Sequence, residues 1–154
     1  MSALDGMYQE VILDHARRRT GEGLVAPAPG HGTGESHQYN PTCGDEITVR
    51  VELAAGPEGA EPVVSRLSWE GEGCSISMAA ASVLAETAPG MTRDELGELI
   101  DAFRDLLRSR GTVVPDEEVL GDAAAFAGVS RFVARVKCAM LGWVAAEEAL
   151  DRAG

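Results

Sequence analysis

The order of apolar and polar residues predicts one helix and then two strands in the first half of the chain. Apolar residues recur at helical spacing near the N-terminus: Leu4, Met7, Tyr8, Val11 and Ile12. Alternating apolar residues then predict strands over 47–53 and 63–69, which the connector AAGPEGAEP joins as a hairpin. The Gly- and Pro-rich stretch 20–37 is expected to be a loop, and ESHQYN before Cys43 could form a third, weaker strand.

The second half of the chain is predicted to be helical. An Ala-rich helix is expected over 75–88. Thr92 and Glu95 have the spacing of a capping box at the start of a strongly amphipathic helix. Asp122 is expected to cap a short Ala-rich turn, and 132–150 to form the last helix.

These elements predict a single α+β domain over residues 1–154, with a small antiparallel sheet of about three strands and helices packed on one side. An apolar content of 45% is enough for one core at this length. The apolar stretches fall short of the roughly 20 residues of a membrane span, and the N-terminus lacks a signal-peptide pattern. A formal net charge of −12 argues against nucleic-acid and membrane partners. We therefore expect a cytoplasmic protein.

Three cysteines lie where the local sequence favours a thiolate. Cys43 and Asp45 are two residues apart, so in an extended segment both side chains leave the backbone on the same side. Cys74 precedes a predicted helix, whose positive end is expected to lower its pKa. Cys138 follows Lys137, the one lysine of the chain, and this cation is expected to act in the same direction.

Three thiolates and one carboxylate would make a tetrahedral Zn²⁺ site, because zinc ligands can come from distant segments of a chain. The residues alone leave an alternative open, since a free cysteine is usually a buried core residue. The histidines have no helical ligand spacing. His37 could reach a site at Cys43, but a surface role is expected for it.

Three segments resemble the motifs of the SufU family, within the wider group of IscU-like iron–sulfur assembly proteins: NPTCGD, GEGCSISMAAAS and GVSRFVARVKCAMLGW. The resemblance extends from MYQEVILDH to the final helix, which is nearly the whole chain. It implies the IscU/SufU-like fold. It also implies a Zn²⁺ site built from Cys43, Asp45, Cys74 and Cys138.

The resemblance favours SufU over IscU. Lys137 stands where IscU scaffolds have a histidine, and SRFVARVK does not contain their chaperone-binding stretch. The segment between Cys74 and Cys138 is also longer than in those scaffolds. SufU-type proteins accept sulfur, in a zinc-dependent reaction, from a pyridoxal-phosphate cysteine desulfurase of the SufS type. The resemblance thus implies a SufS-type partner, and a downstream Suf assembly scaffold as a second one.

Cys43 is the expected sulfur acceptor, since its Gly44–Asp45 loop is expected to be the most mobile of the three cysteine settings. Arg135 and Lys137 flank the site, where they would stabilise thiolate charge or contact the desulfurase; the alternative is that both are simply solvated. Two other functions stay open at this stage. One is a scaffold on which an iron–sulfur cluster is built with the same ligands, and the other is a purely structural zinc site.

Overall fold

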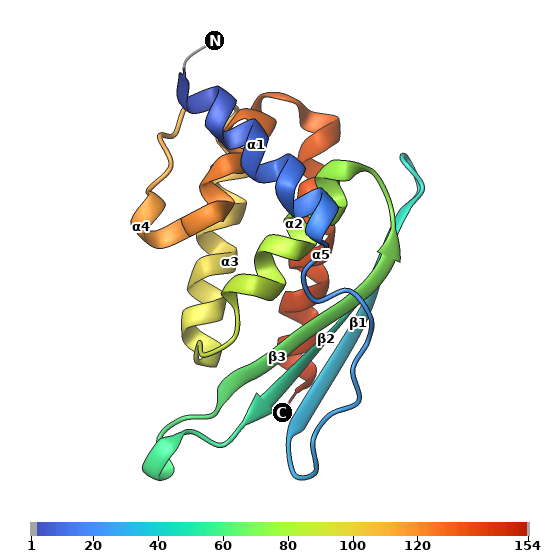
Figure 1. Ribbon diagram of the computed structural model, residues 1–154, viewed down its shortest axis with the longest axis vertical. Coiled ribbons are helices and arrows are strands. Elements are labelled where there is room, and N and C mark those ends of the chain that lie inside the picture. Colours follow the sequence, from blue (N-terminus) through green and yellow to red (C-terminus); the bar gives the residue numbers. More distant parts are fainter. Residues whose placement is uncertain (1–2, 154) are drawn as a thin grey trace.

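The computed structural model describes residues 3–153 and consists of a three-stranded antiparallel sheet with helices on one side (Figure 1). Its elements follow in the order α1 (Ala3–Arg18), β1 (Gly32–Asn40), β2 (Asp45–Ala54), η1 (Pro57–Gly59), β3 (Val63–Glu72), α2 (Ser75–Thr87), α3 (Arg93–Arg108), α4 (Glu117–Leu120), η2 (Gly121–Arg131) and α5 (Val133–Arg152). The strand order is β1-β2-β3. The predicted fold class is confirmed.

The strands are longer than their alternating apolar residues indicated. β1 begins at Gly32 and pairs with β2 from Gly32↔Leu53 to Asn40↔Asp45. The third strand expected at ESHQYN is therefore confirmed, and the loop expected over 20–37 is wrong from Gly32 onward. Backbone pairing with β2 outweighs the low strand propensity of Gly and Ser here, as tertiary context often does.

The inner face of the sheet carries the apolar residues of β2 and β3, and α2 and α5 cover it (Figure 1). β1 contributes small residues to this face. A Cβ atom added at Gly34 would collide with the carbonyl oxygen of Ala149 in α5 and lie 2.6 Å from the nitrogen of Ala153. The glycine thus lets α5 pack directly against the strand backbone.

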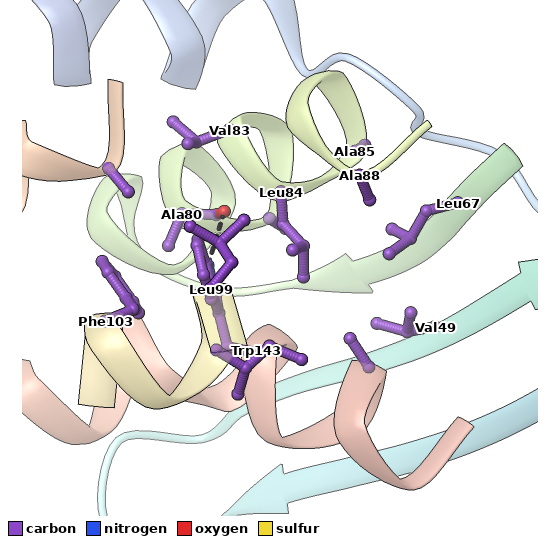
Figure 2. Close-up of a cluster of buried hydrophobic side chains, with 14 of the residues drawn as sticks. Val49, Leu67, Ala80, Val83, Leu84, Ala85, Ala88, Leu99, Phe103 and Trp143 are labelled. Carbon is purple, nitrogen blue, oxygen red and sulfur yellow. Dashed lines mark hydrogen bonds between the residues drawn. The ribbon is translucent and has the colours of Figure 1, made fainter. Parts of the chain in front are cut away.

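Aromatic residues fill the centre of the helical layer. The rings of Phe103 and Trp143 stack with their centroids 3.9 Å apart, and both side chains are fully buried. The indole N–H of Trp143 donates to the carbonyl oxygen of Ala80 at 3.0 Å, as Figure 2 shows. This bond satisfies the one polar atom of the buried indole and fixes α5 against α2.

The predicted capping box is confirmed at the start of α3, where Thr92 Oγ1 accepts from the Glu95 N–H and the Glu95 carboxylate accepts from the Thr92 N–H. The predicted role of Asp122 is wrong. Its carboxylate does not cap η2 and instead lies 2.9 Å from Nε2 of His15. The short helix α4, capped by Asp116, was not predicted.

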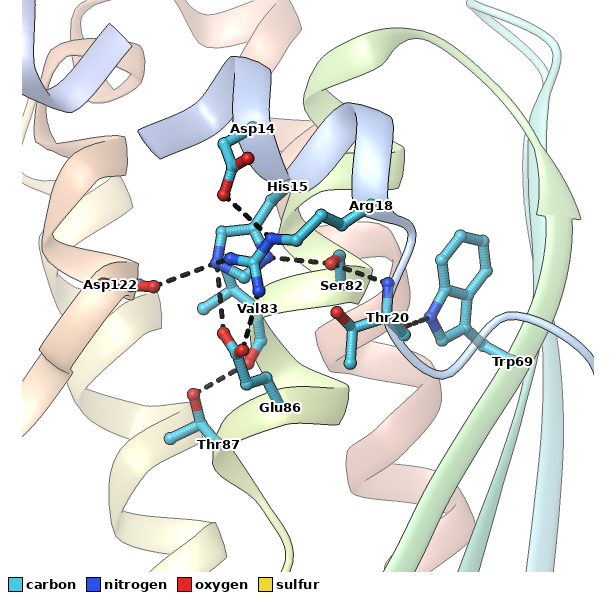
Figure 3. A network of polar contacts seen from close by, with 10 residues as sticks. All are labelled: Asp14, His15, Arg18, Thr20, Trp69, Ser82, Val83, Glu86, Thr87 and Asp122. Carbon is cyan, nitrogen blue, oxygen red and sulfur yellow. Dashed lines mark hydrogen bonds and ion pairs between the residues drawn. The ribbon is translucent and has the colours of Figure 1, made fainter. Parts of the chain in front are cut away.

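His15 is a fully buried polar residue that joins three elements (Figure 3). Its Nδ1 lies 2.8 Å from Ser82 Oγ in α2, and its Nε2 faces Asp122 in η2. The Ser82 hydroxyl also accepts from the backbone N–H of Thr20 at 2.9 Å. This network helps to hold α1 in place, although Met7 of the predicted apolar face is exposed. The side chain of Leu4 lies outside the described residues.

The segment between α1 and β1 runs along the free edge of β3 and then over the outer face of the sheet. Trp69 in β3 exchanges backbone hydrogen bonds with Gly21 and Gly23, at 2.9 and 2.6 Å. Farther along, the carbonyl of Val25 accepts from Arg50, and His31 Nδ1 lies 2.5 Å from the carboxylate of Glu52. The half of the outer face nearer the β2–β3 connector is therefore covered.

Candidate metal centre

The predicted ligands meet at the end of the sheet where the β1–β2 turn, the end of β3 and the start of α5 come together. Cys43 lies in the turn between β1 and β2, and Asp45 is the first residue of β2. Cys74 is the N-cap residue of α2, and Cys138 lies in the second turn of α5. Cys43 and Cys74 are exposed, whereas Asp45 and Cys138 are buried.

Cys43 belongs to a turn, as the loop expected beside Gly44 indicated, and Asp45 already begins β2. Gly44 has a φ of 78°, a conformation that glycine adopts without strain. A Cβ atom at this position would meet nothing within 4 Å. The turn directs Cys43 toward α5, while Asp45 points to the inner face of the sheet.

The two thiols of Cys43 and Cys138 are in contact, with their Sγ atoms 3.7 Å apart. Ligand atoms of Cys43, Asp45 and Cys138 all lie within 4.8 Å of one another. Cys74 joins this group through the carboxylate, since its Sγ is 3.7 Å from Asp45 Oδ2. The structure therefore gathers three of the four predicted ligands into one cluster and places the fourth beside it.

The donor set fits a zinc ion. Two sulfur ligands bound about 2.3 Å from a tetrahedral Zn²⁺ lie about 3.8 Å apart, which is close to the observed separation of Cys43 and Cys138. Thiolates and one carboxylate are ligands that zinc accepts.

Two groups hold the Asp45 carboxylate in this position. The backbone N–H of Cys74 donates to Oδ1 at 3.2 Å, and the Ser77 hydroxyl donates to Oδ2. Ser77 is buried and also lies 3.4 Å from the Cys74 sulfur. Gly73 permits the close approach, because a Cβ atom there would lie 2.8 Å from the Asp45 carboxyl carbon.

No functional role was predicted for Ser77 from the sequence. The serines of this region have no partnered His/Asp arrangement in the sequence that would indicate a nucleophile. The available signal was the spacing: residues three apart at a helix start face the same side, so the N-cap Cys74 and Ser77 are neighbours.

The electrostatic environment differs between the buried carboxylate and the buried thiol. Burial raises the pKa of Asp45, but hydrogen bonds from Ser77, Cys138, Cys43 and the Cys74 N–H together hold it below its usual value. Burial is also the main cause that raises the pKa of Cys138, and the contact with Cys43 and the nearby negative groups add to it. The expectation that Lys137 would favour a Cys138 thiolate is therefore wrong for the metal-free protein.

Arg135 and Lys137 are exposed on α5 and form no ion pair among residues 3–153. Their proposed contact with a partner remains a prediction. His37 has an exposed side chain, as expected, and its Nε2 contacts the Glu46 carboxylate at 3.2 Å.

A second group of ligand types lies apart from the cysteines, where His15, Glu86 and Asp122 also come within 4.8 Å of one another. Arg18 already supplies the positive charge of this group. Its guanidinium pairs with Glu86 at 2.9 Å and lies 3.1 Å from His15 Nε2 (Figure 3). We interpret the group as part of the network that holds α1.

Comparison with known proteins places this site in a wider context. The family model of the NifU-like N-terminal domain matches residues 7–150. The chain is 35% identical to the zinc-dependent sulfurtransferase SufU of Bacillus subtilis (strain 168), over 97% of this chain and 92% of that protein. It is 32% identical to the iron–sulfur cluster assembly scaffold protein IscU of Streptococcus pyogenes serotype M1, over 99% and 87%.

A solved structure is similar over nearly the same length. It is described as a candidate iron–sulfur cluster assembly scaffold protein for the SUF system from Fervidobacterium islandicum AW-1. It superimposes with a TM-score of 0.72 at 29% identity and covers 92% of this chain and 94% of that one. Separately, no helix within the described residues is long and apolar enough to cross a membrane.

Proposed function

We propose, from the premise that this chain belongs to the family of NifU-like N-terminal domains, that it is a zinc-dependent sulfur acceptor in iron–sulfur cluster biogenesis. One observation carries the proposal. An exposed thiol on an open turn, that of Cys43, lies 3.7 Å from the buried thiol of Cys138 and beside the buried carboxylate of Asp45. This arrangement combines a metal-binding donor set with one sulfur that another protein can approach.

The residues that would hold zinc are Cys43, Asp45, Cys74 and Cys138. A bound zinc ion keeps cysteine ligands deprotonated at neutral pH. This chemistry suits Cys138 in particular, because burial, together with its contact with Cys43 and the nearby negative groups, raises its pKa and favours the neutral thiol. Asp45 is already held as a carboxylate by Ser77 and the Cys74 N–H.

Cys43 is the residue that accepts sulfur in this proposal. Its thiolate attacks the outer sulfur of a cysteine persulfide on the donor protein, so that a new S–S bond forms at Cys43 and the donor's own S–S bond breaks. The donor cysteine leaves as a thiolate. The transferred sulfur becomes the terminal sulfur of a persulfide on Cys43, and its protonation state does not change. The exchange needs no external oxidant or reductant.

The proposed donor is a SufS-type, pyridoxal-phosphate-dependent cysteine desulfurase, and the proposed recipient is a downstream Suf assembly scaffold. The relative with 35% identity is named a zinc-dependent sulfurtransferase, which supports the transfer reaction. The proposed compartment is the cytoplasm. Lys137, in the position where IscU scaffolds have a histidine, also supports a transfer role over a scaffold role.

The test measures sulfide released from cysteine by the SufS-type desulfurase of the source organism, in the presence of a thiol reductant. The zinc-loaded protein should accelerate release strongly, and Cys43→Ala should abolish the acceleration. Thr42→Ala, in the same exposed turn, is the matched control and should behave like the wild type. Acceleration that survives Cys43→Ala would contradict the acceptor role.

A second function is supported by the relatives that are named IscU. One is 32% identical and another, from Thermotoga maritima, is 33% identical, so identity alone does not separate transfer from scaffolding. In the scaffold function, the same three thiols and Asp45 would hold an iron–sulfur cluster as cargo. Reconstitution with iron and sulfide distinguishes the two: a stable cluster that passes to an apo-acceptor would favour the scaffold.

A further inference from the structure

The uncovered half of the outer sheet face, next to the metal centre, carries three glutamates and no Lys or Arg. Strand pairing places six side chains there in two rows: Tyr39, Glu46 and Glu72 in the first, and His37, Thr48 and Glu70 in the second. We call these six residues the acidic patch. Five of them, all but Tyr39, line one open depression on the surface.

The acidic patch differs from the rest of the outer face, where acidic side chains have basic partners from the same chain. Arg50 pairs with Glu35 at 2.7 Å, and His31 pairs with Glu52 at 2.5 Å. Within residues 3–153, the only basic contact to a patch glutamate is that of His37 with Glu46. Glu70 and Glu72 have no ion-pair partner in that range.

The patch also contains a like-charge pair. Glu46 and Glu72 are directly opposite each other in the β2–β3 ladder. Like charges at such positions are destabilising. The pair therefore lowers the stability of the protein when no partner is bound. A cationic group from a partner would relieve the repulsion.

The position of the patch connects it with the sulfur-transfer step. Glu46 follows Asp45 directly, and Tyr39 and Glu46 are a cross-strand pair near the turn that carries Cys43. A protein that brings a persulfide to Cys43 therefore comes close to the first row of the patch. The Tyr39 side chain is exposed to 56%, and its ring offers a face on which a guanidinium can stack.

We propose that the acidic patch binds an arginine- or lysine-rich segment of the sulfur-donating desulfurase and so orients the donor toward Cys43. This inference rests on the proposed function. The carboxylates supply charge complementarity, which raises association rates and fixes the register of two partners. The patch is a docking surface and takes no part in the transfer of sulfur.

The experiment compares two triple variants that remove the same three charges. The patch variant carries Glu46→Gln, Glu70→Gln and Glu72→Gln. The control carries Glu58→Gln, Glu61→Gln and Glu98→Gln, three exposed positions in the β2–β3 connector and on α3. The readout is KM and kcat of the SufS-type desulfurase with each zinc-loaded protein as acceptor, at low and at high ionic strength.

The patch variant should raise KM by roughly fivefold at low salt and leave kcat unchanged, and high salt should remove most of the difference from the wild type. Its thermal unfolding midpoint should equal or exceed that of the wild type, because a repulsive pair is gone. The control should keep the wild-type KM.

Two results would overturn the inference, and they differ from each other. If the wild-type protein accelerates the desulfurase but the patch variant and the control have equal KM values, docking does not use this patch and the proposed function stands. If the wild-type protein gives no acceleration at all, the proposed function fails, and the inference that rests on it fails too.

Discussion

The Sγ atoms of Cys43 and Cys138 lie 3.7 Å apart, although 95 positions separate the two cysteines in the sequence. One thiol is exposed on a turn and the other is buried in a helix. The fold thus gives the two predicted zinc ligands a spacing that suits a tetrahedral ion. It also gives the two sulfurs different access to a partner, and this difference assigns them different proposed roles.

Removal of zinc should lower the thermal stability of the protein. An ion that binds only the folded state stabilises it by about 2.7 kcal/mol when its free concentration is 100 times its Kd. We expect the unfolding midpoint to fall after treatment with a chelator and to recover when zinc is added back. Calorimetry with parallel measurement of zinc content is the test. Equal midpoints for the loaded and chelated protein would contradict the assignment of the site.

Ser77→Ala should weaken zinc binding although Ser77 is not a predicted ligand. The Ser77 hydroxyl donates to Asp45 Oδ2 and orients the carboxylate. Loss of such a supporting hydrogen bond typically lowers metal affinity by about 10- to 100-fold. Competition with a chromophoric chelator measures the change. Ser75→Ala, at an exposed position of the same helix turn, is the control and should bind zinc like the wild type.

Glu52→Gln should destabilise the protein at neutral pH and have little effect in acid. Burial raises the pKa of Glu52, but the hydrogen bonds from His31 and the Ala28 N–H outweigh it and hold the pKa below 4.5, its usual value. A carboxyl group with a lowered folded-state pKa stabilises the protein above its unfolded-state pKa, and this contribution disappears as the pH falls through the folded-state value.

Urea denaturation of the wild type and Glu52→Gln between pH 7 and pH 3 would test this. The difference in unfolding free energy should be largest near pH 7 and shrink below roughly pH 4.5. A difference that stayed constant over the whole range would mean that the Glu52 charge does not anchor the segment between α1 and β1.

Two glycine substitutions should change stability in opposite directions. Gly34→Ala forces a Cβ atom into the backbone of α5 and should cost about 3 kcal/mol of unfolding free energy. Gly97→Ala, inside α3, meets nothing within 4 Å and should stabilise the protein by about 1 kcal/mol, because alanine has the higher helix propensity. Thermal or urea unfolding of both variants is the test. A neutral Gly34→Ala would show that α5 can move away from β1.

Local sequence determined the parts of this protein that depend on neighbouring residues. The capping box of Thr92 and Glu95 and the amphipathic pattern that follows it define α3 without any tertiary contact. The alternation in 47–53 likewise defines the middle of β2, because strand neighbours alternate between faces. The cysteine motifs carried enough flanking sequence for the family resemblance, which the family match over residues 7–150 confirms.

Tertiary structure decided what depends on residues far apart in the chain. β1 extends back to Gly32 because β2 offers a continuous partner, and composition alone does not report such a partner. Asp122 turns to His15 instead of capping its own turn, because α1 brings a buried imidazole beside it. Ser77 becomes a support for Asp45 only where β2 meets the start of α2.

The chemistry of the site divides in the same way. The sequence supplied the residue types, three thiols and a carboxylate, and therefore the prediction of a zinc site. It did not supply burial, which raises the pKa of Cys138 against the local effect expected from Lys137. Exposure and desolvation arise from the packing of the whole chain, so only the fold could separate a buried thiol from the one that a partner can reach.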